Sequence, residues 1–363
     1  MIYLDYNATA PLRPGVKEAM LEVLDDPGNA SSIHAHGRTA RKQIETARAQ
    51  VADLVGATAE QVTFNSGATE ANNTILNHYA DQQILISAIE HPCIQEACRP
   101  AAHIPVTRDG LIDLAALETL METHQPALVS VMLVNNETGV IQPIEKISTL
   151  CRVYQTKLHV DGAQATGKIP FNMAKLGIDY LPLSAHKMGG PQGIGALIVR
   201  QSAEPPVLLH GGGQEKRKRG GTENTAGIIG FGVAAAHAKA HIEEFRALSE
   251  LQNRFETGLR NMASDVVVFG EGAERVANTT CCAIPGTTAE TILIAMDLAG
   301  ICISSGSACS RGKVGQSATL GAMDAPDDLL KAALRISTGW FTTQEEIDKL
   351  LEELEKVVKR MRA

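Results

Sequence analysis

The sequence predicts an α/β protein, with a mostly parallel sheet covered by helices on both faces and a smaller α+β part after it. Three observations lead to this class. Short apolar runs alternate with segments of helical periodicity between residues 62 and 199. One run, 127–134, is continuously apolar, as in a strand buried on both faces. After the three glycines at 211–213 this alternation stops.

The N-terminal segment is expected to hold a short strand at 2–6 and two helices. Pro14 suits the first turn of the first helix, whose apolar residues recur at helical spacing from 16 to 24. The second helix is longer and amphipathic, and Gly56 ends it. Each helix therefore has an apolar face to bury.

The middle of the chain should supply the main sheet. Helices are expected at 68–79, after a cap at Asp113, and at 143–154. The strands are expected at 62–64, 84–87, 104–107, 127–134, 158–161, 180–183 and 196–199. Strands separated by helices pair in parallel, because the crossover returns the chain to the same edge.

The C-terminal part has a different pattern of expected helices and strands. A long helical stretch covers 224–263, and short strands are expected at 266–269, 279–284, 301–304 and 334–337. A last helix at 343–361 carries an apolar stripe that suits a core contact. We expect two domains, a large α/β domain at 14–239 and a small α+β domain formed by 1–13 and 240–363.

Composition excludes several classes of protein. The chain has 363 residues, 44% of them apolar, and a net charge of −8, which argues against a nucleic-acid or anionic-membrane partner. The start does not read as a signal peptide, and no apolar run reaches the roughly 20 residues of a spanning helix. The seven cysteines include no Cys-x-x-Cys pair, so we expect no metal site and reduced thiols in a cytoplasmic protein.

Lys187 stands between a short apolar run and a glycine-rich turn. A lysine at the end of a buried strand is costly unless its charge is paired or its pKa is lowered. A neutral lysine is a nucleophile for carbonyl compounds. The alternative is a surface lysine in a glycine-rich hairpin.

Two further strand ends carry polar groups. At Ser66-Gly-Ala-Thr-Glu70 a strand passes through a glycine into a helix, which suits a phosphate. Asp161 follows a buried strand, where a carboxylate needs a partner such as a protonated ring nitrogen. Because ligands bind at the carboxyl ends of parallel strands, both sites and Lys187 should face one crevice. A phosphate, a ring nitrogen and a reactive lysine together describe pyridoxal 5′-phosphate.

The segment from Gly162 to Lys168 matches most of a P-loop. The next residue is Ile169, so the hydroxyl that would bind magnesium is missing. We therefore expect no nucleoside triphosphate site there.

Cys309 is the cysteine whose surroundings suit reactivity. It lies among small polar residues, and Arg311 and Lys313 are close enough in sequence to favour a thiolate. Cys302, by contrast, lies between two isoleucines, as buried structural cysteines do.

With these residues in place, the chain resembles the cysteine desulfurases of the class-V aminotransferase group, which are fold type I enzymes dependent on pyridoxal phosphate. The resemblance covers nearly the whole chain and implies a mostly parallel seven-stranded sheet sandwiched by helices. It rests on the order and spacing of Tyr3-Leu-Asp-Tyr-Asn-Ala-Thr9, Ser66-Gly-Ala-Thr-Glu70, Glu90-His91, Asn135-Asn-Glu-Thr-Gly139, His159-Val-Asp-Gly-Ala-Gln164, Ser184-Ala-His-Lys187, Gly211-Gly-Gly-Gln-Glu215, Gly221-Thr-Glu-Asn224 and Ser304-Ser-Gly-Ser-Ala-Cys309.

The resemblance implies a role for each matching position around the cofactor ring. Lys187 would bind the cofactor covalently and move the substrate Cα proton. Asp161 would pair with the ring nitrogen, Gln164 would bond the phenolic oxygen, and His91 would stack on the ring and assist proton transfer. Without the resemblance, the position of His91 before Pro92 favours a simple loop histidine.

Further positions would hold the phosphate and the substrate. The phosphate would lie against Ala68, Thr69, Ser184, His186 and, from the neighbouring subunit of a homodimer, Thr222. The substrate carboxylate would be bound by Asn136 and by the guanidinium of Arg335, with Asn7 nearby. From its apolar surroundings alone, Arg335 could serve a ligand or a structural carboxylate.

The implied reaction converts L-cysteine to L-alanine and leaves the sulfur on Cys309 as a persulfide. An acceptor such as an iron–sulfur scaffold, or a protein of another thio-cofactor or tRNA-thiolation pathway, would then receive the sulfur. Two alternatives remain on the same scaffold, a selenocysteine lyase or aminotransferase and an inactive binding protein. The basic run 216–219 could be a nucleic-acid patch or a solvated loop, and by resemblance it crosses the dimer interface.

Overall fold

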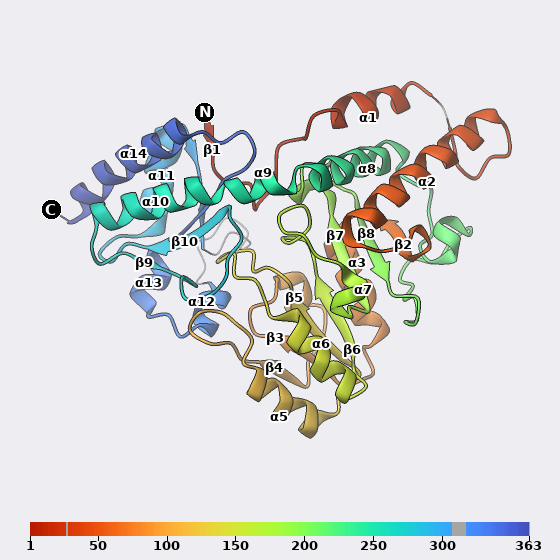
Figure 1. The fold of residues 1–363 in the computed structure, drawn as a ribbon, viewed down its shortest axis with the longest axis horizontal. Coiled ribbons are helices and arrows are strands. Elements are labelled where there is room, and N and C mark those ends of the chain that lie inside the picture. Colours follow the sequence, from red (N-terminus) through yellow and green to blue (C-terminus); the bar gives the residue numbers. More distant parts are fainter. Residues whose placement is uncertain (27, 307–316, 363) are drawn as a thin grey trace.

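The computed structural model describes residues 1–26, 28–306 and 317–362. Figure 1 shows a larger part around one sheet and, to its left, a smaller part that carries the C-terminus. Cys309 falls outside the described residues.

The larger part is built on a seven-stranded sheet of order β2-β8-β7-β6-β5-β3-β4. β8 runs antiparallel to both of its neighbours, and all other neighbouring pairs are parallel. The predicted mostly parallel seven-stranded sheet is thus confirmed. Its strands are β2 (Val62–Asn65), β3 (Ile84–Ser87), β4 (Ala102–Ile104), β5 (Leu128–Met132), β6 (Lys157–Asp161), β7 (Tyr180–Ser184) and β8 (Gly195–Val199).

One strand was predicted in the wrong place. The edge strand β4 ends at Ile104, whereas the apolar pattern suggested 104–107. Pro105 follows immediately, and a proline cannot donate to a strand ladder, so the pairing stops there.

Helices cover both faces of this sheet, and alternate strand residues pack against each set. Leu85 and Val129 belong to the cluster on one face, while Ile84, Ile86 and Leu128 belong to the cluster on the other. The first cluster includes residues of α1 (Val16–Leu24), α2 (Ala35–Val55), α5 (Leu114–His124), α6 (Ile144–Val153), α7 (Met173–Leu176) and α8 (Thr225–Ala240). The second includes residues of α3 (Ala68–His78) and α4 (Pro92–Gln95).

Two predicted helix ends are confirmed in detail. Asp113 caps α5, since its Oδ1 accepts hydrogen bonds from the backbone N–H groups of Ala115 and Ala116, each at 3.0 Å. Gly56 ends α2 in the left-handed conformation, with φ of 68°.

The smaller part has an antiparallel sheet of order β12-β13-β10-β9, and β1 (Ile2–Tyr3) pairs in parallel with β11. The expected strand at 301–304 is two strands, because β11 pairs with β1 while β12 pairs with β13. The remaining strands are β9 (Val267–Val268), β10 (Thr279–Ala283), β11 (Ile301–Cys302), β12 (Ser304–Ser305) and β13 (Ala333–Ser337). The helices are α9 (Ile242–Ala247), α10 (Ser249–Met262), α11 (Ala289–Leu298), α12 (Ala318–Ala322), α13 (Asp327–Ala332) and α14 (Gln344–Arg362).

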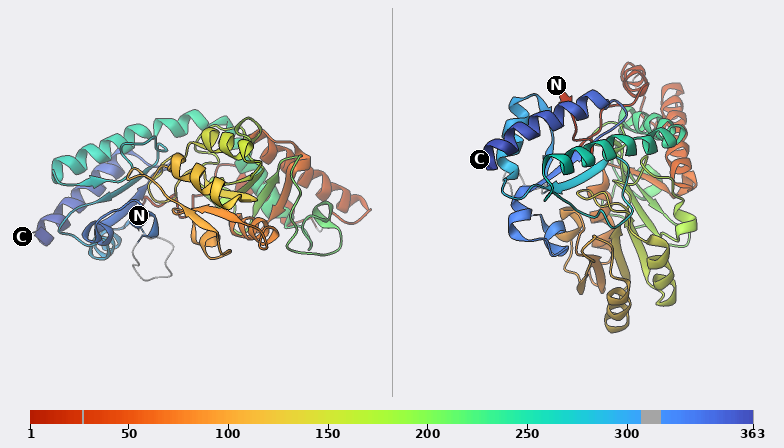
Figure 2. Two further views of the ribbon diagram at one scale, coloured as in Figure 1. Left: turned by 90° about the horizontal axis from the view of Figure 1, so that it is seen from below. Right: turned by 60° about the vertical axis from the view of Figure 1, so that its left-hand side comes forward.

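The two parts are bridged by helices. The helical stretch expected at 224–263 is three helices, α8, α9 and α10, broken at His241 and Leu248. They follow one another from the larger to the smaller part, as Figures 1 and 2 show. The stripe of α14 packs into the core of the smaller part, as expected, and Leu4 from the N-terminal segment joins the same cluster. We propose the division at 14–239 against 1–13 and 240–363 on this basis.

Within the described residues, no helix combines the length and the apolar character needed to cross a bilayer.

Candidate active site

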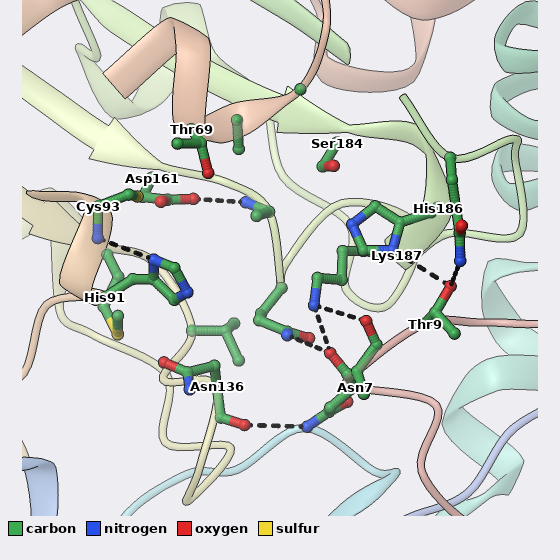
Figure 3. Close-up of a pocket in the computed structure, with 18 of the residues that line it drawn as sticks. Asn7, Thr9, Thr69, His91, Cys93, Asn136, Asp161, Ser184, His186 and Lys187 are labelled. Carbon is green, nitrogen blue, oxygen red and sulfur yellow. Dashed lines mark hydrogen bonds between the residues drawn. The ribbon is translucent and has the colours of Figure 1, made fainter. Parts of the chain in front are cut away.

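A cavity of about 600 Å³ opens where several strands of the main sheet end and α3 begins. Residues of β6, β7 and β13 line it together with the segment after β1. Figure 3 shows Asp161, Ser184, Lys187 and Asn7 among the polar side chains around this space. Eleven of the predicted site residues line this cavity, namely Asn7, Ala68, Thr69, His91, Asn136, Asp161, Gln164, Ser184, His186, Lys187 and Arg335.

Lys187 ends a short 3-10 turn, Ala185–Lys187, directly after β7. Its side chain is half-buried, and Nζ donates hydrogen bonds to the backbone oxygens of Asn7 at 2.6 Å and Ala8 at 3.0 Å. The surface-hairpin alternative is therefore wrong. Because the acceptors belong to the N-terminal segment, that segment helps to position the amine in the cavity.

His186 lies beside the lysine. Its Nδ1 is 3.2 Å from the hydroxyl of Thr9. Burial, and then the charge of Lys187, lower the pKa of His186 to about 4. The imidazole is therefore neutral near pH 7 and can donate one hydrogen bond to an anion.

Asp161 ends β6 and is nearly buried. Its Oδ2 accepts a hydrogen bond from Asn72 Nδ2, and its Oδ1 accepts one from the backbone N–H of Ala163, both at 2.8 Å. Both donors are neutral, so neither cancels the charge of the carboxylate. A cationic group in the cavity would do so.

The start of α3 suits a phosphate. Gly67 occupies the N-cap with φ of 149°, a conformation that side chains disfavour, and it offers the helix no side-chain cap. The first N–H groups of the helix thus remain available for an anion, beside Thr69 and Ser184 on the cavity wall.

His91 caps the short helix α4, and its Nδ1 accepts a hydrogen bond from the backbone N–H of Cys93 at 3.1 Å. Burial lowers the pKa of His91, although Asp161 opposes this. The ring is therefore neutral and held, with its Nε2 carrying the proton. Its place on the cavity wall favours a site histidine over a loop histidine.

Arg335 on β13 is almost fully buried and has the structural carboxylate partner that was one of its two interpretations, while its role toward a ligand stays a prediction. Its Nη2 pairs with Asp5 Oδ1 at 2.7 Å, and its Nη1 donates to the backbone oxygen of Asn136 at 3.1 Å. Its Nε is buried and has no hydrogen-bond partner within the described ranges. The guanidinium therefore keeps a donor that an anion in the cavity would satisfy.

Lys168 is a residue whose place the sequence did not reveal. Its side chain is buried, and Nζ donates hydrogen bonds to Asn7 Oδ1 at 2.5 Å and to Gln164 Oε1 at 2.6 Å. Burial sets the pKa of Lys168 well below its usual value. The P-loop pattern drew attention to a nucleotide, whereas the spacing of four residues from Gln164 was the useful signal.

Two buried carboxyl groups near the cavity, Glu90 and Glu137, belong to motifs of the resemblance, but the sequence assigned neither of them a role. Burial raises the pKa of Glu90 well above its usual range, and Glu90 Oε1 accepts a hydrogen bond from the backbone N–H of Met132. Burial also raises the pKa of Glu137 to about 7, and Glu137 accepts a hydrogen bond from Ser317. The charge of Asp161 adds to the effect of burial at Glu90, so the protonated form of Glu90 is favoured beside Asp161.

Thr222 and the basic run lie elsewhere. Thr222 is exposed and lines a separate small hollow with Arg219, so a role at a neighbouring subunit stays a prediction. Arg219 pairs with Glu70 at 3.0 Å, and Lys218 Nζ donates to the backbone oxygen of Glu60. These contacts hold part of the run against the larger part of the molecule.

The cavity fits pyridoxal 5′-phosphate. It offers an amine for the aldehyde, a carboxylate held by neutral donors for the ring nitrogen, and an uncapped helix start for the phosphate. No group of three or more metal-ligating side chains occurs in the part of the chain that the structure describes.

Known proteins match this chain over almost all of its length. The model of the aminotransferase class-V family matches residues 2–350. A cysteine desulfurase IscS of Dictyoglomus turgidum is 38% identical, over 99% of this chain and 95% of the relative. Among solved structures, a NifS-like protein of Rickettsia africae superposes with a TM-score of 0.93 at 38% identity, covering 99% of both chains. A structure of SspA in complex with cysteine superposes with a TM-score of 0.81 at 30% identity, covering 93% of this chain and 98% of that one.

Proposed function

The chain belongs to the aminotransferase class-V family and, within it, to the cysteine desulfurases, and on that premise we propose how its residues carry the reaction. The enzyme converts L-cysteine to L-alanine and passes the sulfur on. Bound pyridoxal 5′-phosphate supplies an aldehyde for the amino group and a ring that accepts electrons from the substrate Cα.

The observation that carries the proposal is that Lys187, Asp161 and Arg335 line one cavity. They come from the end of β6, the 3-10 turn after β7 and the middle of β13, and each suits one part of a cofactor-bound amino acid. The amine would react with a carbonyl carbon, the carboxylate would pair with a ring nitrogen, and the guanidinium would bind a substrate carboxylate.

With the cofactor bound, Lys187 would be the amine that binds its carbonyl carbon and later moves the proton at the substrate Cα. Asp161 would pair with the ring nitrogen, and Gln164 would bond the phenolic oxygen. His91 would lie against the ring, where its neutral imidazole would take or give a proton.

The phosphate is held by Thr69, Ser184 and His186, with the backbone at Ala68 beside them. Thr222 of a second copy of the chain completes the phosphate site, so we propose a homodimer.

The substrate is L-cysteine, in line with the cysteine bound to SspA. Arg335 binds its carboxylate together with Asn136. The side chain of Asn7 is held by Lys168, Thr279 and Asn278, so Asn7 shapes the substrate site as a fixed wall.

The sulfur leaves through Cys309. Its thiolate attacks the sulfur of the substrate, an S–S bond forms, and the Cβ–S bond breaks with its electron pair left on carbon. Protonation of that carbon gives L-alanine, so L-cysteine and one thiol yield L-alanine and one persulfide. We propose a cytoplasmic acceptor, an iron–sulfur scaffold or a tRNA-thiolation protein, because persulfide transfer requires reduced thiols.

A single-turnover experiment tests this assignment. One equivalent of L-cysteine should yield one equivalent of L-alanine, and alkylation with mass spectrometry should place the extra sulfur on the peptide containing Cys309. Cys309→Ala should keep the absorbance of the bound cofactor and lose the persulfide, while Cys98→Ala serves as the matched control. Normal sulfur output from Cys309→Ala would contradict the assignment.

A further inference from the structure

A chain of hydrogen bonds runs through the middle of the main sheet to Asp161. Ser130 Oγ on β5 lies 2.9 Å from His159 Nδ1 on β6. His159 Nε2 lies 2.9 Å from Asn72 Oδ1 on α3, and Asn72 Nδ2 lies 2.8 Å from Asp161 Oδ2. Ser130, His159 and Asn72 are all fully buried, so water does not compete for these bonds.

The chemistry of Asp161 determines the direction of every bond in this chain. A carboxylate only accepts hydrogen bonds, so Asn72 turns its NH₂ group to Asp161 and its carbonyl oxygen to His159. His159 must then carry its proton on Nε2. Burial lowers the pKa of His159 to about 3, so the ring is neutral and its Nδ1 accepts from the hydroxyl of Ser130.

We propose that Ser130, His159 and Asn72 form a positioning relay that holds Asp161 ionised and oriented toward the ring nitrogen of the cofactor. The inference rests on the proposed role of Asp161. None of the three relay residues lines the cavity, so each acts through the next.

The relay works because all of its donors point the same way. Successive hydrogen bonds polarise one another in a buried site, and the last one is assisted by the charge on Asp161. The backbone N–H of Ala163 holds the other carboxylate oxygen, so rotation of the carboxyl group would break a bond on each side. Burial, and then the charge of Asp161, raise the pKa of Glu90, the carboxyl group close to Asp161.

The test compares two ligands of the apoprotein, pyridoxal 5′-phosphate and its 1-deaza analogue, in which a C–H replaces the ring nitrogen. Asn72→Leu and His159→Leu should weaken binding of pyridoxal 5′-phosphate by about tenfold to a hundredfold, the usual range for a hydrogen bond to a charged group. Binding of the analogue should change by less than about threefold, because that ligand makes no bond to Asp161.

Three further proteins are needed for comparison. His159→Gln can still donate to Asn72 and accept from Ser130, so it should bind both ligands like the wild type. Ile75→Val removes one methyl group from a buried residue of α3, the helix that carries Asn72. This variant should also leave the ratio of the two affinities unchanged. Ser130→Ala, the mildest change, should lower the ratio by about threefold and serves if the leucine variants fail to fold.

If the relay variants bound both ligands equally more weakly, or bound neither more weakly, the relay would be overturned, since a merely structural role cannot distinguish the two ligands. Asp161→Asn separates this from a failure of the proposed function. If Asp161→Asn leaves the ratio of affinities unchanged, the role of Asp161 itself is wrong. If Asp161→Asn abolishes the preference for pyridoxal 5′-phosphate over the analogue and the relay variants do not, only the relay is wrong. The ¹⁵N chemical shift of ring-labelled cofactor gives a second readout, and it should move toward the unprotonated value in Asn72→Leu and His159→Leu.

Discussion

Lys168 Nζ lies 2.6 Å from Gln164 Oε1, and both side chains are nearly buried. The two ends of an amide differ, so this donor turns the Gln164 oxygen toward Lys168. The Gln164 Nε2 then faces the other way and donates to the backbone oxygen of Asn7 at 2.9 Å. The orientation of Gln164, for which we propose a hydrogen bond to the phenolic oxygen of the cofactor, therefore depends on Lys168.

Lys168→Met should weaken binding of pyridoxal 5′-phosphate by about tenfold, because Gln164 loses the donor that orients it. The free energy of unfolding of the apoprotein should change by less than about 2 kcal/mol. The substitution removes two hydrogen bonds, which destabilises the fold, but it also removes a costly buried amine, which offsets that loss. Absorbance titration and urea unfolding measure the two quantities. Lys175→Met, on the surface of α7, is the control, and equal cofactor affinity in both variants would rule out the dependence.

Arg335→Lys should raise KM for L-cysteine by about tenfold to a hundredfold, because an ammonium cannot reproduce the two-point fork of a guanidinium. The absorbance of the bound cofactor should stay the same. Cysteamine lacks the carboxylate, so the preference of the enzyme for cysteine over cysteamine should fall by the same factor. The matched control is Arg275→Lys, which alters a buried arginine–glutamate pair away from the cavity. An unchanged preference would show that Arg335 does not bind the substrate carboxylate.

Glu137→Gln should stabilise the protein at pH 8. The folded pKa of Glu137 is about 7 against an ordinary 4.5, so between these values the folded state holds a proton that the unfolded state has lost. The stability from this group is complete below pH 4.5 and is lost as pH rises through 7. The loss is about 3 kcal/mol, and a neutral glutamine avoids it. Urea unfolding of the apoprotein at pH 5 and pH 8 gives the comparison, with Glu145→Gln at an exposed position as control. If the free energy of unfolding changed equally between the two pH values in the wild type and in Glu137→Gln, the raised pKa of Glu137 would be refuted.

His159→Gln should stabilise the protein at low pH, whereas Glu137→Gln does so at high pH. The folded pKa of His159 is about 3 against an ordinary 6.5, so the unfolded state binds the extra proton. Stability from this group is therefore lost as pH falls below 6.5, by about 2 kcal/mol at pH 5. Between pH 7 and pH 5, the variant should therefore keep the free energy of unfolding that the wild type loses through His159, as measured by urea unfolding of the apoprotein. His103→Gln, at an exposed position, should follow the wild type, and an equally steep loss in His159→Gln would contradict a neutral buried histidine.

Much of the fold could be predicted from local patterns. Six strands of the main sheet, the cap at Asp113 and the stop at Gly56 each depend on residues a few positions apart. The edge strand β4 was misplaced for a local reason, because Pro105 ends it at Ile104. Another error lies where the pairing partners decide. The expected strand at 301–304 is divided because its two halves pair with different strands, and no local pattern shows that.

Most of the site could also be predicted, because each motif lies at a strand end and parallel strands bring their ends together. The supporting residues could not. Asn72 is an ordinary polar residue on an amphipathic helix, and Lys168 belongs to a motif typical of another ligand. Their roles depend on contacts with Asp161 and Asn7, which lie far from them in the sequence.

The residue pattern alone was enough to assign the chemistry, since a lysine, a carboxylate, a helix start and a loop cysteine occur in a family-specific order. The packing of distant segments decided which groups orient and neutralise those residues. Burial sets the protonation of His159, Lys168 and Glu137, and the direction of each buried hydrogen bond follows from its neighbours in space. Asp161 and Lys187 could therefore be found in the sequence, whereas the relay through Asn72 and the donor behind Gln164 required the folded chain.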